Sequence, residues 1–190
     1  MLVPTPPTTI TWALGRASSA ANSTGWLLFV AAVMITWFDD LEVTRFLKLQ
    51  NPPSLDAEKE WLDRMARDPD SVFWVVEHVG RVVGGTSIVR IDWKHGFGTT
   101  GTVLGDKSVW GKGLGRELMQ LRADYAFTQT PLRKLKSGYL AGNEASARAQ
   151  RAAGYKDVGR WTRDRFIDGE WRDHILTELL REDWQQKRSV

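Results

Sequence analysis

The sequence contains no cysteine and only three histidines. Without cysteine, the chain cannot form disulfides, thiolate metal sites or a cysteine-linked covalent intermediate. Asp92 and His95 lie close together in the sequence and could act as a base or as metal ligands. Without a third and a fourth ligand, however, such a pair is more typical of a surface loop. We therefore expect no bound metal.

The chain also lacks runs of basic residues and long apolar segments. Its 26 lysines and arginines are interspersed with 23 acidic residues, and the pI is near 9.3. This mild bias would favour a polyphosphate ligand but does not predict a nucleic-acid surface. The most apolar run, residues 26–38, is too short to cross a bilayer, and no basic segment precedes it. We expect a buried helix there, in a cytoplasmic protein that does not bind membranes.

Length and hydrophobic content predict a single domain. With 190 residues, of which 42% are hydrophobic, the chain can bury one full core but is short for two. Residues 1–7 are rich in proline and are expected to form a loose leader, and residues 185–190 a charged tail. Residues 1–190 are thus predicted to form one domain, as a monomer or a homodimer.

Residues 99–125 are the most informative stretch. A β-branched segment leads into a basic turn with glycines at alternate positions, Gly111, Gly113 and Gly115, and an amphipathic helix follows. Glycine can adopt positive φ and lets the backbone approach a ligand, and the first N–H groups of a helix are left without intrahelical partners. The stretch therefore predicts a phosphate site, although a simple tight turn would give the same pattern. The predicted buried face of the helix consists of Leu114, Leu118, Leu121 and Tyr125.

Two common phosphate loops are excluded by their spacing. The separation of Gly105 from Gly111 is wrong for a Walker loop, and Lys112 is followed by glycine instead of serine or threonine. The dinucleotide fingerprint requires a glycine where Leu118 stands. The predicted site belongs to neither class.

The remaining elements follow from turn and capping signals. Strands are predicted at residues 8–14, 71–77, 81–92, 99–106, 134–139, 155–166 and 171–180. Helices are predicted from about residue 22 to 40 and on to 49, then at 54–67, 114–128 and 143–153. This order predicts an α+β (mixed α/β) fold with a mostly antiparallel sheet of about seven strands, flanked by helices. One strand-loop-helix-strand crossover places the ligand near Trp110 to Arg116.

The residues resemble the GNAT superfamily of acyl-coenzyme A dependent N-acetyltransferases, most closely its Rim-type branch of ribosomal-protein N-terminal acetyltransferases. The resemblance covers about residues 37–184. It rests on residues 37–40, 42–47, 61–62, 105–115, 125–127, Asn143, 154–155, 168–173 and 180–184.

The resemblance implies a site for acetyl-CoA and direct transfer of its acetyl group to a primary amine. In that family the glycine turn binds the diphosphate, two splayed parallel strands hold the pantetheine, and a main-chain N–H here near Leu104 or Gly105 would polarise the thioester carbonyl. The implied cofactor-binding residues are Leu104, Trp110, Gly111, Lys112, Gly113, Leu114, Gly115, Arg116 and Asn143.

Three departures from the Rim-type pattern concern catalysis and the acceptor. Thr99 stands near the usual glutamate base, so the base is unassigned, and Gln150 stands where a tyrosine commonly protonates the leaving thiolate. Ser146 and Tyr155 are the nearest hydroxyl substitutes, and Ser146 ranks first because it lies one turn after Asn143. Residues 1–36 lack the usual opening of the family.

Two other functions remain open at this point. The replacements at Thr99 and Gln150 would also suit a catalytically degenerate protein that binds coenzyme A or a protein partner. A nucleic-acid binder is supported only by the pI and the ten tryptophans. The acceptor, whether a protein N-terminus or a small-molecule amine, is not determined by the sequence.

Overall fold

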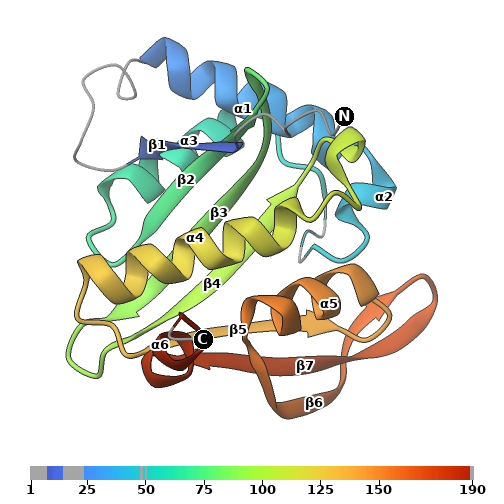
Figure 1. The fold of residues 1–190 in the computed structure, drawn as a ribbon. Helices are drawn as coiled ribbons and strands as arrows, with labels where there is room; N and C mark the ends of the chain where they lie inside the picture. Colours follow the sequence, from blue (N-terminus) through green and yellow to red (C-terminus); the bar gives the residue numbers. More distant parts are fainter. Residues whose placement is uncertain (1–7, 15–23, 48, 50, 189–190) are drawn as a thin grey trace, which may run out of the picture. The chain divides into compact units, whose positions relative to one another are not determined.

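The structure, a computed structural model, describes residues 8–14, 24–47, 49 and 51–188 (Figure 1). The strands are β1 (Thr8–Leu14), β2 (Val72–His78), β3 (Arg81–Asp92), β4 (Phe97–Leu104), β5 (Lys134–Leu140), β6 (Lys156–Ile167) and β7 (Glu170–Leu180). The helices are α1 (Thr24–Phe38), α2 (Leu41–Thr44), α3 (Leu55–Arg67), α4 (Leu114–Gln129), α5 (Glu144–Ala153) and α6 (Arg181–Arg188). The predicted α+β class, with a mostly antiparallel sheet, is confirmed.

The chain divides into two compact units, and strands β3 and β4 contribute residues to both. The first unit contains the residues up to Ser87 together with Val103–Trp110. The second contains Ile88–Thr102 and the chain from Gly111 onward. The predicted leader, residues 1–7, lies outside the described residues, and the expectation of a single domain stays a prediction.

In the first unit, β1 pairs with β2 and β2 with β3, and helices α1 and α3 pack on each other. Ser54 caps α3 as predicted, because its hydroxyl accepts from the Ala57 N–H at 3.2 Å. The predicted helix over residues 40–49 is wrong beyond Thr44. Asp40 is extended and caps the short α2, and this cap interrupts the helical path.

In the second unit, the strands follow the order β3-β4-β5-β7-β6, and the β4–β5 pair is parallel. Helix α4 connects the two parallel strands, so the predicted crossover is confirmed. The predicted Asp168-Gly169 hairpin turn is also confirmed, with φ of 52° and 79° at its two residues. Gly154 ends α5 in the left-handed region, as predicted.

One prediction about the surface of the second unit is wrong, because Leu121, predicted to be buried, is 39% exposed. Of the expected charged tail, residues 185–190, the part up to Arg188 belongs to α6, and residues 189–190 lie outside the described residues. Helix α6 is held by side chains that donate to other elements, including Trp184 Nε1 to Asp124 at 2.7 Å and Lys187 Nζ to the Ala152 carbonyl at 2.6 Å. Such contacts leave no periodic pattern in the sequence.

Candidate acyl-CoA site

The glycine turn presents the start of α4 without a side-chain cap. Gly111 and Gly113 adopt φ of 72° and 84°, and Gly113 is the N-cap residue. The first helical hydrogen bond runs from the Glu117 N–H to the Gly113 carbonyl at 3.2 Å. The N–H groups that precede Glu117 in the first turn therefore have no acceptor within the helix. This geometry suits an anion, since a helix N-terminus carries a partial positive charge.

Exposed cations flank this turn. Lys112 and Arg116 are both exposed, and within the described ranges neither takes part in an ion pair. Leu114, by contrast, is 5% exposed and anchors the helix start in the core. The turn thus combines a fixed backbone with two cationic side chains that can adjust to a phosphate.

Strands β4 and β5 separate after a short parallel contact. Their pairing covers only Phe97–Thr99 and Lys134–Lys136, although both strands continue for several residues. At the point of separation the Thr100 hydroxyl donates to the Lys136 carbonyl at 3.1 Å. Because the backbone pattern of a strand repeats every second residue, the polar backbone groups of Gly138 and Leu140 point to the same edge as Lys136. This edge can pair with an extended ligand.

Helix α5 covers the separated part of β5 through a chain of hydrogen bonds. Asn143 caps the helix by accepting from the Ser146 N–H at 3.1 Å. Gln150, which is 2% exposed, donates to the Ser146 hydroxyl at 3.1 Å and to the Gly138 carbonyl at 3.0 Å. Thr177 donates to the other end of the Gln150 amide at 2.5 Å. Gln150 is therefore fixed, and Ser146 is held above the strand edge.

Tyr155 lies in a buried network with Arg122. The arginine is 2% exposed and donates to the Gly101 carbonyl at 2.8 Å, to Thr102 at 2.9 Å and to the Tyr155 hydroxyl at 3.2 Å. Tyr155 itself is 3% exposed. The Tyr155 hydroxyl is therefore buried and already hydrogen bonded to Arg122. Ser146, which is only partly buried, has the more accessible of the two hydroxyls.

Leu104 and Trp110 belong to the first unit, where the indole N–H of Trp110 donates to the Leu104 carbonyl at 2.8 Å. The Gly105 N–H donates to Val83 at 2.9 Å, so Leu104 is the more suitable of the two candidate main-chain donors. Lys107 follows in the same unit and contacts Asp40 at 2.6 Å. These contacts with Lys107 and the Glu42 backbone lower the pKa of Asp40.

Most of the predicted site residues belong to the second unit. These are Gly111, Lys112, Gly113, Leu114, Gly115, Arg116, Asn143, Ser146 and Tyr155. Sequence reasoning missed Arg122, although its place one turn after Leu118, on the buried face of α4, was an available signal. It also missed Gly138, for which the sequence gives no signal.

Comparison with known proteins identifies the family. The profile of the acetyltransferase (GNAT) domain matches residues 30–156, which is more than half of the chain. The chain belongs to the GNAT acetyltransferase family. The chain is 33% identical to a Bacillus subtilis protein named "Probable N-acetyltransferase YjcK", over 43% of this chain and 45% of that protein.

One further sequence relative and one solved structure are also similar to this chain. The ribosomal protein uS5-alanine N-acetyltransferase of Escherichia coli is 32% identical over 41% of this chain and 40% of that protein. The chain thus spans less than half of the length of these curated relatives. The spermidine N-acetyltransferase of Vibrio cholerae, solved in complex with CoA and spermine, is 20% identical with a TM-score of 0.77, and the match covers 94% of this chain and 98% of that one. This likeness shows the GNAT fold.

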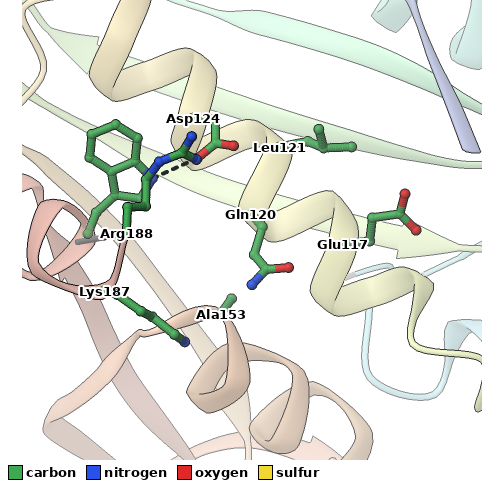
Figure 2. Close-up of a pocket in the computed structure, with 8 residues that line it drawn as sticks. Glu117, Gln120, Leu121, Asp124, Ala153, Lys187 and Arg188 are labelled. Atoms are coloured by element: carbon green, nitrogen blue, oxygen red, sulfur yellow. Dashed lines mark hydrogen bonds and ion pairs between the residues drawn. The ribbon is translucent and has the colours of Figure 1, made fainter. Parts of the chain in front are cut away.

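A separate cavity of about 380 Å³ lies beside the middle of α4 (Figure 2). Gln120 and Asp124 of α4 line one side, and Lys187 and Arg188 of α6 line the other. Arg188 contacts Asp124 at 2.8 Å across it.

Among the described residues, no helix is long and apolar enough to cross a membrane. The same part of the chain contains no cluster of side chains that could bind a metal ion.

Proposed function

We propose that this protein transfers an acetyl group from acetyl-CoA directly to a primary amine. The observation that carries the proposal is that one unit contains both a helix N-terminus preceded by glycine, with no side-chain cap, and an open strand edge. The first suits the diphosphate of the cofactor, and the second suits the amide-containing pantetheine arm. Family membership and a CoA-bound structural relative support the same ligand.

In this proposal each part of the cofactor has a named partner. The N–H groups of Gly113 to Arg116 bind the diphosphate, and Lys112 and Arg116 add positive charge. Pantetheine pairs with the backbone groups of Gly138 and Leu140. Because Gln150 already donates to the Gly138 carbonyl, the N–H of Gly138 is the group offered to the ligand at that residue.

The proposed chemistry is attack by a neutral amine on the thioester carbonyl. No cysteine is present to form an acyl-enzyme, so transfer is expected without a covalent intermediate. The family resemblance implies the Leu104 N–H as the donor to the developing oxyanion. Ser146, oriented by Asn143 and Gln150, hydrogen bonds to the departing thiolate. Tyr155 ranks below Ser146 because Arg122 already donates to its hydroxyl in a buried site.

The acceptor is proposed to be a protein N-terminus or a small-molecule amine. The Rim-type resemblance and the uS5-alanine relative support the first, while the spermidine N-acetyltransferase supports the second only through its fold. The alternative, a degenerate member that binds CoA without catalysis, is supported by one observation. Gln150 is locked by Thr177 and Gly138 where a tyrosine acid is usual, and an amide does not supply a proton at neutral pH.

Calorimetric titration with acetyl-CoA tests the binding half of the proposal. We expect binding that weakens with salt, and Gly113→Val should reduce the affinity at least tenfold because valine resists φ of 84°. The matched control is Gly169→Val, since Gly169 has φ of 79° and equally open surroundings in the β6–β7 turn. Equal affinity of the two variants would show that the diphosphate site is misplaced.

Thiol release tests the catalytic half. Acetyl-CoA would be incubated with alanine-terminated peptides and with polyamines, and free CoA would be measured with a thiol reagent. Turnover with either class supports an enzyme and identifies the acceptor class. Binding of acetyl-CoA without turnover on any amine supports the degenerate alternative.

A further inference from the structure

The most informative group outside the residues discussed so far is a buried histidine on β7. His174 is 7% exposed and packs directly on Gly138 of β5. A side chain at Gly138 would begin 2.4 Å from His174 Nε2, so only glycine fits beneath this ring. Gly138 is also the first residue beyond the β4–β5 pairing whose polar backbone groups face the open edge. Nε2 therefore lies at the place where the two strands separate.

A carboxylate faces the other nitrogen of the same ring. Asp164 of β6 lies with Oδ2 3.3 Å from His174 Nδ1, and its side chain is 18% exposed. Arg165 contacts the same carboxylate at 3.3 Å. A carboxylate beside Nδ1 favours the tautomer with the proton on that nitrogen, which leaves Nε2 as the proton-accepting atom.

A tryptophan ring also packs on His174, and the basic residues close to His174 and Gly138 in sequence contact other groups. Trp161 of β6 stacks edge-on against His174, with 5.4 Å between the ring centroids. Arg172, two residues before His174 on the same strand, pairs with Glu170 at 2.9 Å. Lys136, the exposed cation of β5 nearest to Gly138 in sequence, lies over the Phe97 ring at 3.3 Å.

We propose that His174 is the general base of the acetyl transfer, with Asp164 as its positioning residue. This inference rests on the proposed function, because the reacting thioester must lie in the gap beside Gly138. It supplies the base that the glutamate-to-threonine departure at Thr99 leaves unassigned. The Asp164–His174 contact spans two strands of the closing hairpin, so the two residues lie ten positions apart in the sequence.

The acceptor arrives as an ammonium ion and gives one proton to Nε2, which forms an imidazolium stabilised by Asp164. The neutral nitrogen attacks the thioester carbon, and the C–S bond breaks as the oxyanion collapses. The second proton lost by the nitrogen passes to the thiolate, so the products are the amide, CoA thiol and one proton released from His174 to solvent.

Kinetics of His174→Gln with spermidine and an alanine-terminated peptide test this role. We expect kcat to fall at least a hundredfold with little change in acetyl-CoA affinity. The deficit should shrink as the pH rises, because more of the amine is then already neutral. With hydroxylamine, which is largely neutral at pH 7.5, the deficit should nearly disappear. Asp164→Asn should lower kcat by about tenfold and keep the KM for acetyl-CoA.

His95→Gln is the matched control. His95 also faces an aspartate, with its Nδ1 2.8 Å from Asp92, but its side chain is 59% exposed on the β3–β4 turn. We expect this variant to keep wild-type kinetics. If His174→Gln keeps kcat within threefold of wild type, or loses activity equally at all pH values and with hydroxylamine, His174 is not the base and the proposed function stands.

A nuclear magnetic resonance experiment tests the position of His174 at the acetyl-CoA site without a measurement of enzyme activity. The chain has three histidines, so its imidazole signals can be assigned with the two glutamine variants. Addition of acetyl-CoA should shift the His174 signal and leave that of His95 in place. If acetyl-CoA binds and the His174 signal does not move, the inference is wrong. If acetyl-CoA does not bind, the proposed function fails together with it.

Discussion

A buried glutamate in the first unit gives a prediction that depends on pH. Glu58 lies on α3 and is 6% exposed, on the same helix face as the buried Leu62 and Met65. Its Oε1 atom has no hydrogen-bond partner among the described residues. Burial raises the pKa of Glu58 from 4.5 to about 7, because the ionised carboxylate loses its hydration. Near neutral pH the folded protein therefore carries a poorly solvated carboxylate.

The sign and the size of the effect follow from proton linkage. Between pH 4.5 and about 7 the folded state binds more protons at Glu58 than the unfolded state, so the free energy of unfolding falls as the pH rises. At about 1.4 kcal/mol for each tenfold difference in proton affinity, the total loss is at most roughly 3.5 kcal/mol. The loss is complete above pH 7 and absent well below pH 4.5.

Glu58→Gln removes this titration and keeps the shape of the side chain. At pH 8 we expect the variant to unfold at a higher urea concentration than wild type, with a free energy of unfolding larger by up to roughly 3.5 kcal/mol, and at pH 4 we expect little difference. Urea unfolding followed by circular dichroism at several pH values measures both. Glu60→Gln is the control, because the Glu60 side chain on the same helix is 73% exposed. Parallel stability curves for wild type and Glu58→Gln would refute the reasoning.

Two further predictions concern packing. Gly105→Ala should destabilise the protein by about 1–3 kcal/mol, because the new methyl group would begin 1.9 Å from the buried Trp37 ring, and thermal unfolding measures the loss. Asp124→Ala should loosen α6, because it removes the acceptor of the Trp184 indole and the partner of Arg188. We expect faster hydrogen exchange over Arg181–Arg188 and a loss of about 1–2 kcal/mol.

Each of these two substitutions, Gly105→Ala and Asp124→Ala, has a matched control variant. Gly25→Ala adds a methyl group in α1 with nothing within 4 Å, so it should keep or slightly raise the stability. Equal effects at Gly25 and Gly105 would contradict the packing argument. Lys156→Ala removes an ion pair to α6 whose lysine is 64% exposed, and it should change little. If it loosens α6 as much as Asp124→Ala does, the indole bond is not what holds the helix.

Local chemistry explains which elements could be predicted. The N-caps Ser54 and Asn143, the C-cap Gly154 and the Asp168-Gly169 turn all act within a few residues, so the sequence displays them directly. The same applies to the positive φ of Gly113 at the start of α4. The element order and the glycine turn before α4 were predictable for this reason.

Other features depend on the surroundings of each element. Helix α6 is charged and has no apolar face of its own, so its order comes from partners such as Asp124 and Ala152. Leu121 has helical spacing but points away from the core. In both cases the local pattern does not show what packs against the helix.

The sequence by itself determined the family resemblance, the glycine turn and the elements around it, because these are properties of neighbouring residues. Only the tertiary structure decided which side chains meet at the strand edge. Gln150 meets Thr177, and His174 meets Asp164 and Gly138, through the register of β5, β6 and β7. Because a shift of one residue in that register would turn each strand side chain to the opposite face, the composition of the site follows from strand pairing.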